Sequence, residues 1–176
     1  MPELYQYNTL PSNNFIRLLE LHSGPAGENI KCTLHQVELD KASNYEAISY
    51  AWGDPTDQSS ILCDNKIIIV TRNLNDALLR LKLNDRSRFL WADAICINQS
   101  DDIEKGSQVQ QMARIYGNAT TVCVWLGYAT AQMQPAFELI DDIVSQGRLI
   151  NSCTFPHLDD NEPSTDKLDN QTELSS

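Results

Sequence analysis

The chain has 176 residues, 41% of them hydrophobic, which suits one globular domain with its own core. Its 24 acidic residues outnumber 13 lysines and arginines, so the formal net charge of −11 has the wrong sign for binding nucleic acid through phosphates. No stretch approaches the ~18 apolar residues of a membrane span, and the N-terminus lacks a signal-peptide pattern, which predicts a soluble, cytoplasmic protein with no membrane partner.

The first part of the chain predicts three strands. Residues 15–21 and 30–39 alternate apolar and polar side chains and are separated by glycines, which predicts an antiparallel pair. A third short strand is expected at 47–50, where the glycine and proline of 51–55 stop its continuation.

A hairpin and a helix are predicted next. The runs 61–63 and 66–70 flank Asp64-Asn65, a two-residue connection that suits a tight hairpin. Thr71 or Asn73 can cap a helix that extends to about Leu83, because its apolar residues recur at helical spacing.

The middle of the chain predicts a βαβ unit with a right-handed crossover between parallel strands. A strand at 89–92 leads into a polar loop, 93–102, and then a helix at about 104–116. The run 121–126 is β-branched and aromatic, as expected for a strand that is covered on both faces. The apolar face of the helix is predicted to be Val109, Met112, Ala113 and Tyr116.

The C-terminal part predicts one more helix and a tail. A helical pattern spans about 131–144, with Phe137, Ile140 and Val144 on one face. Beyond 151 the chain is acidic and too polar to offset the entropy of ordering, so we expect disorder. The predicted parts are therefore the lead-in 1–44, a main domain 45–150, and the disordered tail 151–176.

The five cysteines predict neither a zinc site nor a disulfide framework, since none form a CxxC pair and no histidine lies at ligand spacing. Cys32, Cys63 and Cys123 have apolar neighbours, as reduced core cysteines do. Cys96 would need a neighbouring base to become a nucleophile, and its segment contains no histidine.

Polar residues follow two of the predicted strands. Loops that leave the carboxyl ends of parallel strands converge at one edge of an α/β sheet, so we expect a shared rim with Trp52 and Asp54 across a cleft from Asp93. The candidate binding residues are Tyr50, Trp52, Gly53, Asp54, Asp93, Asn98, Gln99 and Asp102.

Each polar rim residue also has a structural explanation. Asp101 could cap the following helix, with Glu104 reaching back to the Asp101 N–H in a capping box. Asp93 could accept hydrogen bonds from loop N–H groups. Asn98 and Gln99 could satisfy buried loop backbone, which must find partners.

The tryptophans are expected in different environments. Trp91 and Trp125 lie within apolar strands and are predicted to be in the core. Trp52, in a loop with glycine and proline, is the tryptophan that we place near a ligand. The phosphate-binding patterns GxGxxG and GxxxxGK[ST] do not occur in the sequence.

Three blocks, in this order, resemble the heterokaryon incompatibility (HET) domain of filamentous fungi. They are Tyr45–Asp54, the helical pattern from Asn73 to Leu81, and Leu90–Gln99, and the likeness continues to Gly127. The resemblance implies a cytoplasmic module that triggers regulated cell death when genetically unlike fungal cells fuse, or that acts in related self/non-self recognition.

The HET domain is in turn similar to Toll/interleukin-1 receptor (TIR) domains, which have a flavodoxin-like sheet and some of which cleave NAD. The expected fold is therefore α/β, with a mostly parallel sheet flanked by helices, an N-terminal antiparallel pair and the disordered tail. The likeness makes Glu138 a catalytic candidate, because the TIR glutamate lies on the helix after the strand that 121–126 would match. Helical spacing alone explains Glu138 as an exposed acid beside a core leucine.

Two functions stay open. The first is an interaction module whose rim binds a protein partner or mediates self-association. The second is an NAD-cleaving hydrolase in which Glu138 or Glu104 stabilises an oxocarbenium-like ribose and Trp52 stacks on a base.

We expect no metal and no bound cofactor. A Mg²⁺ site at Asp93, Asp102 and Glu104 has suitable oxygen ligands, but nothing in the sequence fixes octahedral spacing. After Gly127 the chain holds one helical pattern and a tail where such proteins usually continue, which suggests a fragment of a longer gene product.

Overall fold

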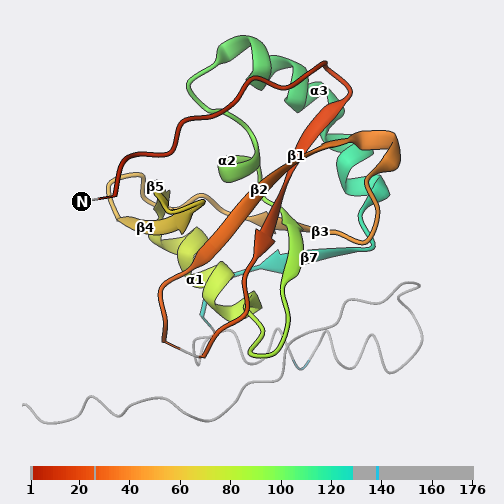
Figure 1. Cartoon of the computed structure of the whole chain (residues 1–176). Helices are drawn as coiled ribbons and strands as arrows, with labels where there is room; N and C mark the ends of the chain where they lie inside the picture. Colours follow the sequence, from red (N-terminus) through yellow and green to blue (C-terminus); the bar gives the residue numbers. More distant parts are fainter. Residues whose placement is uncertain (1, 26, 129–137, 139–176) are drawn as a thin grey trace, which may run out of the picture.

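The computed structural model describes residues 2–25, 27–128 and 138, which form an α/β structure around a mixed sheet (Figure 1). The sheet has the strand order β5-β4-β2-β1-β6-β3-β7. The strands are β1 (Phe15–Leu21), β2 (Lys31–Glu38), β3 (Glu46–Tyr50), β4 (Gln58–Cys63), β5 (Lys66–Thr71), β6 (Arg88–Trp91) and β7 (Thr121–Trp125). The helices are α1 (Arg72–Leu81), α2 (Asp93–Cys96) and α3 (Asp102–Asn118), with a 3-10 turn at Leu39–Lys41.

The expectation of a mostly parallel sheet is wrong. Strand β1 pairs antiparallel with both β2 and β6, and β4 pairs antiparallel with β5. The parallel pairs are β3 with β6, β3 with β7, and β2 with β4. The predicted N-terminal pair is real, but β1 also joins the parallel strands, with Leu19 opposite Leu90. Alternation of side chains identifies a strand and does not say which neighbours it takes.

The predicted hairpin and first helix are confirmed. Asp64 and Asn65 both have positive φ, 49° and 63°, as a two-residue turn of type I′ requires. Thr71 caps α1, since its side chain accepts a hydrogen bond from the Leu74 N–H.

The helices α1 and α3 contact opposite faces of the sheet. Trp91 is level with Ala47 of β3, and its ring contacts Tyr116 of α3 with 5.5 Å between centroids. Trp125 is level with Tyr50 of β3, and its indole hydrogen-bonds to α1. Because Ala47 and Tyr50 are three residues apart, the side chains at these two levels point to opposite faces.

The segment predicted as a polar loop, 93–102, contains the short helix α2. Ile95, Cys96 and Ile97 are buried in the core, with at most 2% of each residue exposed. The loop prediction was wrong because the apolar run Ile95–Ile97 packs in the core. The polar residues on both sides of this run hid its apolar character in the sequence.

The predicted apolar face of the second helix is wrong in part. Val109 and Ala113 are exposed, whereas Gln108, Gln111 and Ile115 are buried. The Gln108 side chain donates a 2.9 Å hydrogen bond to the Phe15 carbonyl, and Gln111 donates to the Asn13 carbonyl. The buried side of α3 therefore carries amide side chains, because these hydrogen-bond to backbone carbonyls at and before the start of β1.

Strand β7 is at an edge of the sheet and is not covered on both faces as predicted. Val122 is 41% exposed and Val124 is 60% exposed. The predicted helix at 131–144 and the predicted tail beyond 151 lie outside the described residues. Within the described ranges, no helix is both long and apolar enough to cross a bilayer.

Of the three cysteines predicted to lie in the core, Cys32 and Cys63 do so, and Cys123 does not. Cys32, Cys63 and Cys96 are buried and unbridged, and Cys123 is unbridged and half-buried on β7. The three buried cysteines pack with aliphatic residues of β1, α1 and α2 in one continuous core. Strands β3, β6 and β7 pair in parallel, so their carboxyl ends lie at one edge of the sheet.

Candidate functional site

Tyr50, Trp52 and Asp93 meet where β3 and β6 end. The Tyr50 hydroxyl donates to Asp93 Oδ1 at 3.0 Å, and the Trp52 indole N–H donates to Asp93 Oδ2 at 3.0 Å. The two loops therefore meet at one edge as predicted, because β3 and β6 are parallel, but Trp52 bonds directly to Asp93 and does not face it across a cleft.

Both oxygens of the Asp93 carboxylate accept hydrogen bonds. Besides the two side chains, Oδ1 accepts a 2.8 Å hydrogen bond from the Ala94 N–H, which is the structural role that the sequence left open. Burial and the negative charge of Asp93 hold the pKa of Tyr50 well above its usual 10, so its hydroxyl stays a donor. The result is a fixed cluster that orients the indole of Trp52.

The loop after β3 presents Trp52 at the surface, where 47% of it is exposed. Gly53 has φ of 76°, a backbone conformation that disfavours any side chain, so this turn requires glycine. Asp54 bonds within its own turn, since its Oδ1 accepts from the Thr56 N–H at 2.8 Å and from the Thr56 hydroxyl at 2.7 Å. These bonds lower the pKa of Asp54.

A hollow of about 260 Å³ adjoins this cluster between β3, β7 and α1. Trp125 contributes to its wall and donates a 2.8 Å hydrogen bond to Asn73 Oδ1, so it is a half-buried rim residue and not the core residue predicted. Sequence reasoning also missed Asn73 and Leu126 at this site. Only the pairing of Tyr50 with Trp125 in parallel strands places them there. The lining residues are Ser49, Tyr50, Ala51, Asn73, Val124, Trp125 and Leu126.

Glu104, a predicted catalytic candidate, lies in a buried ion pair. Its two oxygens accept hydrogen bonds of 2.6 and 2.9 Å from the Arg17 guanidinium, and the side chains are 9% and 2% exposed. Glu104 also accepts from the Asn98 N–H at 2.7 Å. Asp101 caps α3 as predicted, but Glu104 does not complete a capping box, since the Asp101 N–H donates to the Asn98 carbonyl.

Arg17 was missed by sequence reasoning, although an arginine within the apolar run FIRLLEL was an available signal. Its guanidinium also donates to the carbonyls of Cys96 at 3.1 Å and Asn8 at 2.7 Å. The ring of Tyr7 lies below it, 5.0 Å from the guanidinium carbon. Arg17 therefore ties the N-terminal segment, α2 and α3 together beneath the rim.

The remaining predicted site residues have structural positions. Asn98 accepts from the Ser100 N–H at 3.2 Å, and Gln99 donates to the Asp93 carbonyl at 2.9 Å, so both brace the loop after α2. Asp102 is exposed in the first turn of α3, where an acid suits the helix dipole. Glu138 is exposed, and its neighbours in sequence lie outside the described residues.

The described residues do not suggest metal or thiolate chemistry. Among them, no group of three or more His, Cys, Asp or Glu side chains could hold a metal ion. Burial raises the pKa of Cys96 to about 12, so its thiol stays protonated at neutral pH.

Comparison with known proteins adds independent evidence. The family model described as "Heterokaryon incompatibility protein (HET)" matches residues 45–173. "Heterokaryon incompatibility protein 6, OR allele" of Neurospora crassa is 32% identical over 160 residues, which cover 80% of this chain. The chain spans only 23% of the length of that relative. No solved structure matches the chain.

Proposed function

The chain belongs to the heterokaryon incompatibility family, and from this premise we propose that its rim is a protein-recognition surface that acts in fungal self/non-self recognition. The family and the Neurospora relative support a role in heterokaryon incompatibility. In this proposal, binding of a protein partner or of a second copy at the rim leads to regulated cell death.

The observation that carries the proposal is an exposed indole held in a fixed orientation beside apolar surface. Asp93 fixes Trp52, and the adjoining hollow is flanked by Val124 and Leu126, which are 60% and 57% exposed. Tryptophan is enriched among the few residues that dominate binding energy at protein interfaces. A preoriented aromatic also loses little entropy on binding.

The charge distribution near β7 favours a second copy as the occupant. The sequence has no charged residue from Ile115 to Phe137, a segment that includes β7 and its exposed valines. Two identical chains of net charge −11 repel each other, and the repulsion is least where neither carries charge. An isologous contact around β7 would place one uncharged surface on another.

The site gives less support to NAD cleavage. A glycosidic reaction needs a carboxylate that can face the developing positive charge on the sugar. Asp93 already accepts three hydrogen bonds, and Glu104 is neutralised by Arg17. The hydrolase alternative therefore rests on Glu138.

The proposal is tested by expressing the chain and its Trp52→Ala variant in a filamentous fungus and scoring viability. We expect Trp52→Ala to lose most of the killing activity and to elute as a smaller species in size-exclusion chromatography. Phe89→Ala is the matched control, because Phe89 is a 40% exposed aromatic on β6, at the opposite end of the strands from the rim. A folded Trp52→Ala variant that kills as well as the parent chain would refute the proposal.

The same cells discriminate the two functions through their NAD content. We expect cell death without a prior fall in NAD, both in the parent chain and in Glu138→Ala. A fall in NAD that precedes death and disappears in Glu138→Ala would support the hydrolase instead.

A further inference from the structure

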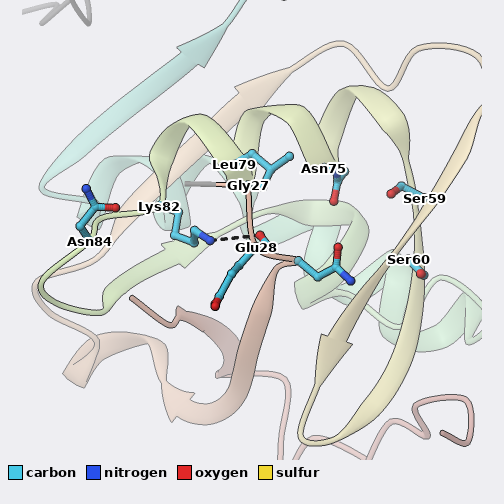
Figure 2. A pocket seen from close by; sticks show the side chains of 9 residues that line it. Gly27, Glu28, Ser59, Ser60, Asn75, Leu79, Lys82 and Asn84 are labelled. Carbon is cyan, nitrogen blue, oxygen red and sulfur yellow. Dashed lines mark hydrogen bonds between the residues drawn. The ribbon is translucent and has the colours of Figure 1, made fainter. Parts of the chain in front are cut away.

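A second hollow, separate from the rim, lies between α1, the first half of β4 and the loop before β2 (Figure 2). Its volume is about 230 Å³. Asn75 of α1 contributes to this hollow, whereas Asn73 contributes to the rim hollow. Side chains two residues apart in an α-helix differ in direction by roughly 200° around the helix axis, so the two hollows lie on different sides of α1.

The lining is dominated by uncharged hydrogen-bonding side chains. Ser59 of β4 lies across from Asn75 in Figure 2, and Ser60, Asn29 and Asn84 also contribute to the lining. Each amide and each hydroxyl can both donate and accept hydrogen bonds. Such a lining matches a ligand whose own groups do both.

Asn75 is the strongest single sign of a ligand. It is only 9% exposed, and among the described residues its amide is not one of the fully buried polar atoms that lack a partner, so the amide reaches the solvent of the hollow. A ligand group that bonds to this amide would replace the solvent there with a direct hydrogen bond.

The edge of β4 adds backbone groups to the hollow. The Leu62 N–H donates to the Ile30 carbonyl at 2.9 Å, so it points toward β2. Residues two apart in a strand direct their N–H groups to the same edge, and Ser60 therefore also points that way. Strand β2 pairs with β4 only at Leu62 and Cys63, so the ladder supplies no partner for Ser60.

The Glu28 carbonyl, which precedes β2, already accepts a hydrogen bond from Lys82. Lys82 donates from its ammonium to the carbonyls of Glu28 at 3.1 Å and Pro25 at 2.9 Å, which tethers the loop to the end of α1 (Figure 2). Ser60 thus presents a backbone N–H to the hollow.

Charge in the hollow is balanced. A Cβ at Gly24 would lie 3.1 Å from Glu28 Oε2 and 3.8 Å from Lys82 Nζ, so the carboxylate and the ammonium lie near one point. The net charge of −11 on the whole chain repels anions. These features favour a neutral ligand over a phosphate or a carboxylate.

From these observations we propose that the hollow binds a small neutral polyhydroxyl compound, of the size of a monosaccharide. The hollow, at about 230 Å³, is smaller than pockets for drug-sized ligands, which are about 300–1,000 Å³. At roughly 30 Å³ per water it replaces roughly seven or eight waters, which suits one sugar ring and excludes a dinucleotide. Leu79 supplies an apolar patch for the face of the ring.

The proposal is tested by NMR titration of the full chain with glucose, mannose, galactose and N-acetylglucosamine, separately. We expect at least one sugar to shift the side-chain amide signals of Asn75 and Asn84 and the backbone signal of Ser60. Signals of the rim, including the Trp52 indole N–H, should not move. Inorganic phosphate and acetate serve as anionic probes and should leave the hollow unchanged.

Variants separate a ligand site from a structural one. Asn75→Leu should retain or gain thermal stability while sugar binding weakens at least tenfold, and Asn84→Ala, on an exposed loop, should weaken binding without affecting folding. Asn118→Ala, an exposed asparagine at the end of α3, is the control and should bind as the parent does. The proposal is overturned if no sugar shifts these signals at concentrations that detect millimolar binding, or if phosphate shifts them instead.

Discussion

At the scale of single residues, one carboxylate organises the rim. Asp93 could be assigned to the rim from sequence, because it follows a strand directly and parallel strands end together. Its partners could not all be assigned. Asp54 follows β3 in the same way, but its carboxylate accepts hydrogen bonds from Thr56 within the same turn. The sequence does not show whether such a side chain bonds locally or to a distant partner.

The role of Glu104 illustrates the same limit. Helix-start preferences suggested a cap, and the acidic cluster suggested a site, whereas the structure pairs Glu104 with Arg17, 87 residues away in sequence. No local pattern reveals such a partner. An isolated arginine in an apolar strand indicates that a buried counter-charge exists without naming it.

The Arg17–Glu104 pair gives a prediction at this scale. Replacing Glu104 by glutamine leaves the buried guanidinium without its counter-charge, so we expect a loss of about 3–5 kcal/mol in the free energy of unfolding. Arg17→Met should also destabilise, and the double variant should lose less than the sum, by about 0.5–3 kcal/mol. Urea unfolding at neutral pH measures all three.

The exposed pair Arg114–Asp40 is the control for that double-mutant cycle. Its side chains are 51% and 61% exposed, so Arg114→Met should cost no more than about 1 kcal/mol. Additive effects of the Arg17 and Glu104 substitutions would show that the two side chains do not stabilise each other.

At the scale of elements, the hairpin, α1 and the positions of the strands were predictable because each has a local signature. The buried face of α3 was not. Apolar periodicity selected Val109 and Ala113, but the carbonyls that precede β1 are satisfied by Gln108 and Gln111 on the buried side. A tertiary hydrogen bond to a distant backbone leaves no mark on the local pattern.

The orientation of α3 is tested by two truncations. Val109 is 52% exposed, so Val109→Ala should change the free energy of unfolding by less than about 0.5 kcal/mol. Ile115 is fully buried, so Ile115→Ala should cost about 2–5 kcal/mol. Thermal or urea unfolding distinguishes these results from the reverse order, which the face predicted from sequence would give.

At the scale of the whole molecule, the sheet has a rim at one end and an ionic cluster at the other. Arg88 of β6 donates to both oxygens of Glu46 on β3 and to the Leu81 carbonyl at the end of α1. Cys123 of β7 donates to the same carboxylate at 3.2 Å. This cluster joins the three parallel strands and α1, the elements that carry the rim at their other ends.

The cluster makes stability depend on pH in a defined direction. Burial of Glu46 alone would raise its pKa, but hydrogen bonds and the charge of Arg88 outweigh burial and lower the pKa below 4.5. Because the unfolded chain then binds the proton more readily, the stabilisation is present above about pH 4.5 and is lost as pH falls through the lower pKa of the folded state.

Glu46→Gln removes this contribution and keeps the size of the side chain. We expect the variant to be less stable than the parent chain at neutral pH, and the difference to shrink as pH falls below about 4.5, where the parent carboxylate is protonated as well. Urea unfolding of both proteins from neutral pH to about pH 3, at one high salt concentration that screens the excess of acids, isolates this group. A difference in stability that is the same at every pH would show that the ionised form of Glu46 does not hold β3, β6 and β7 together. The rim would then depend on packing alone for the alignment of its strands.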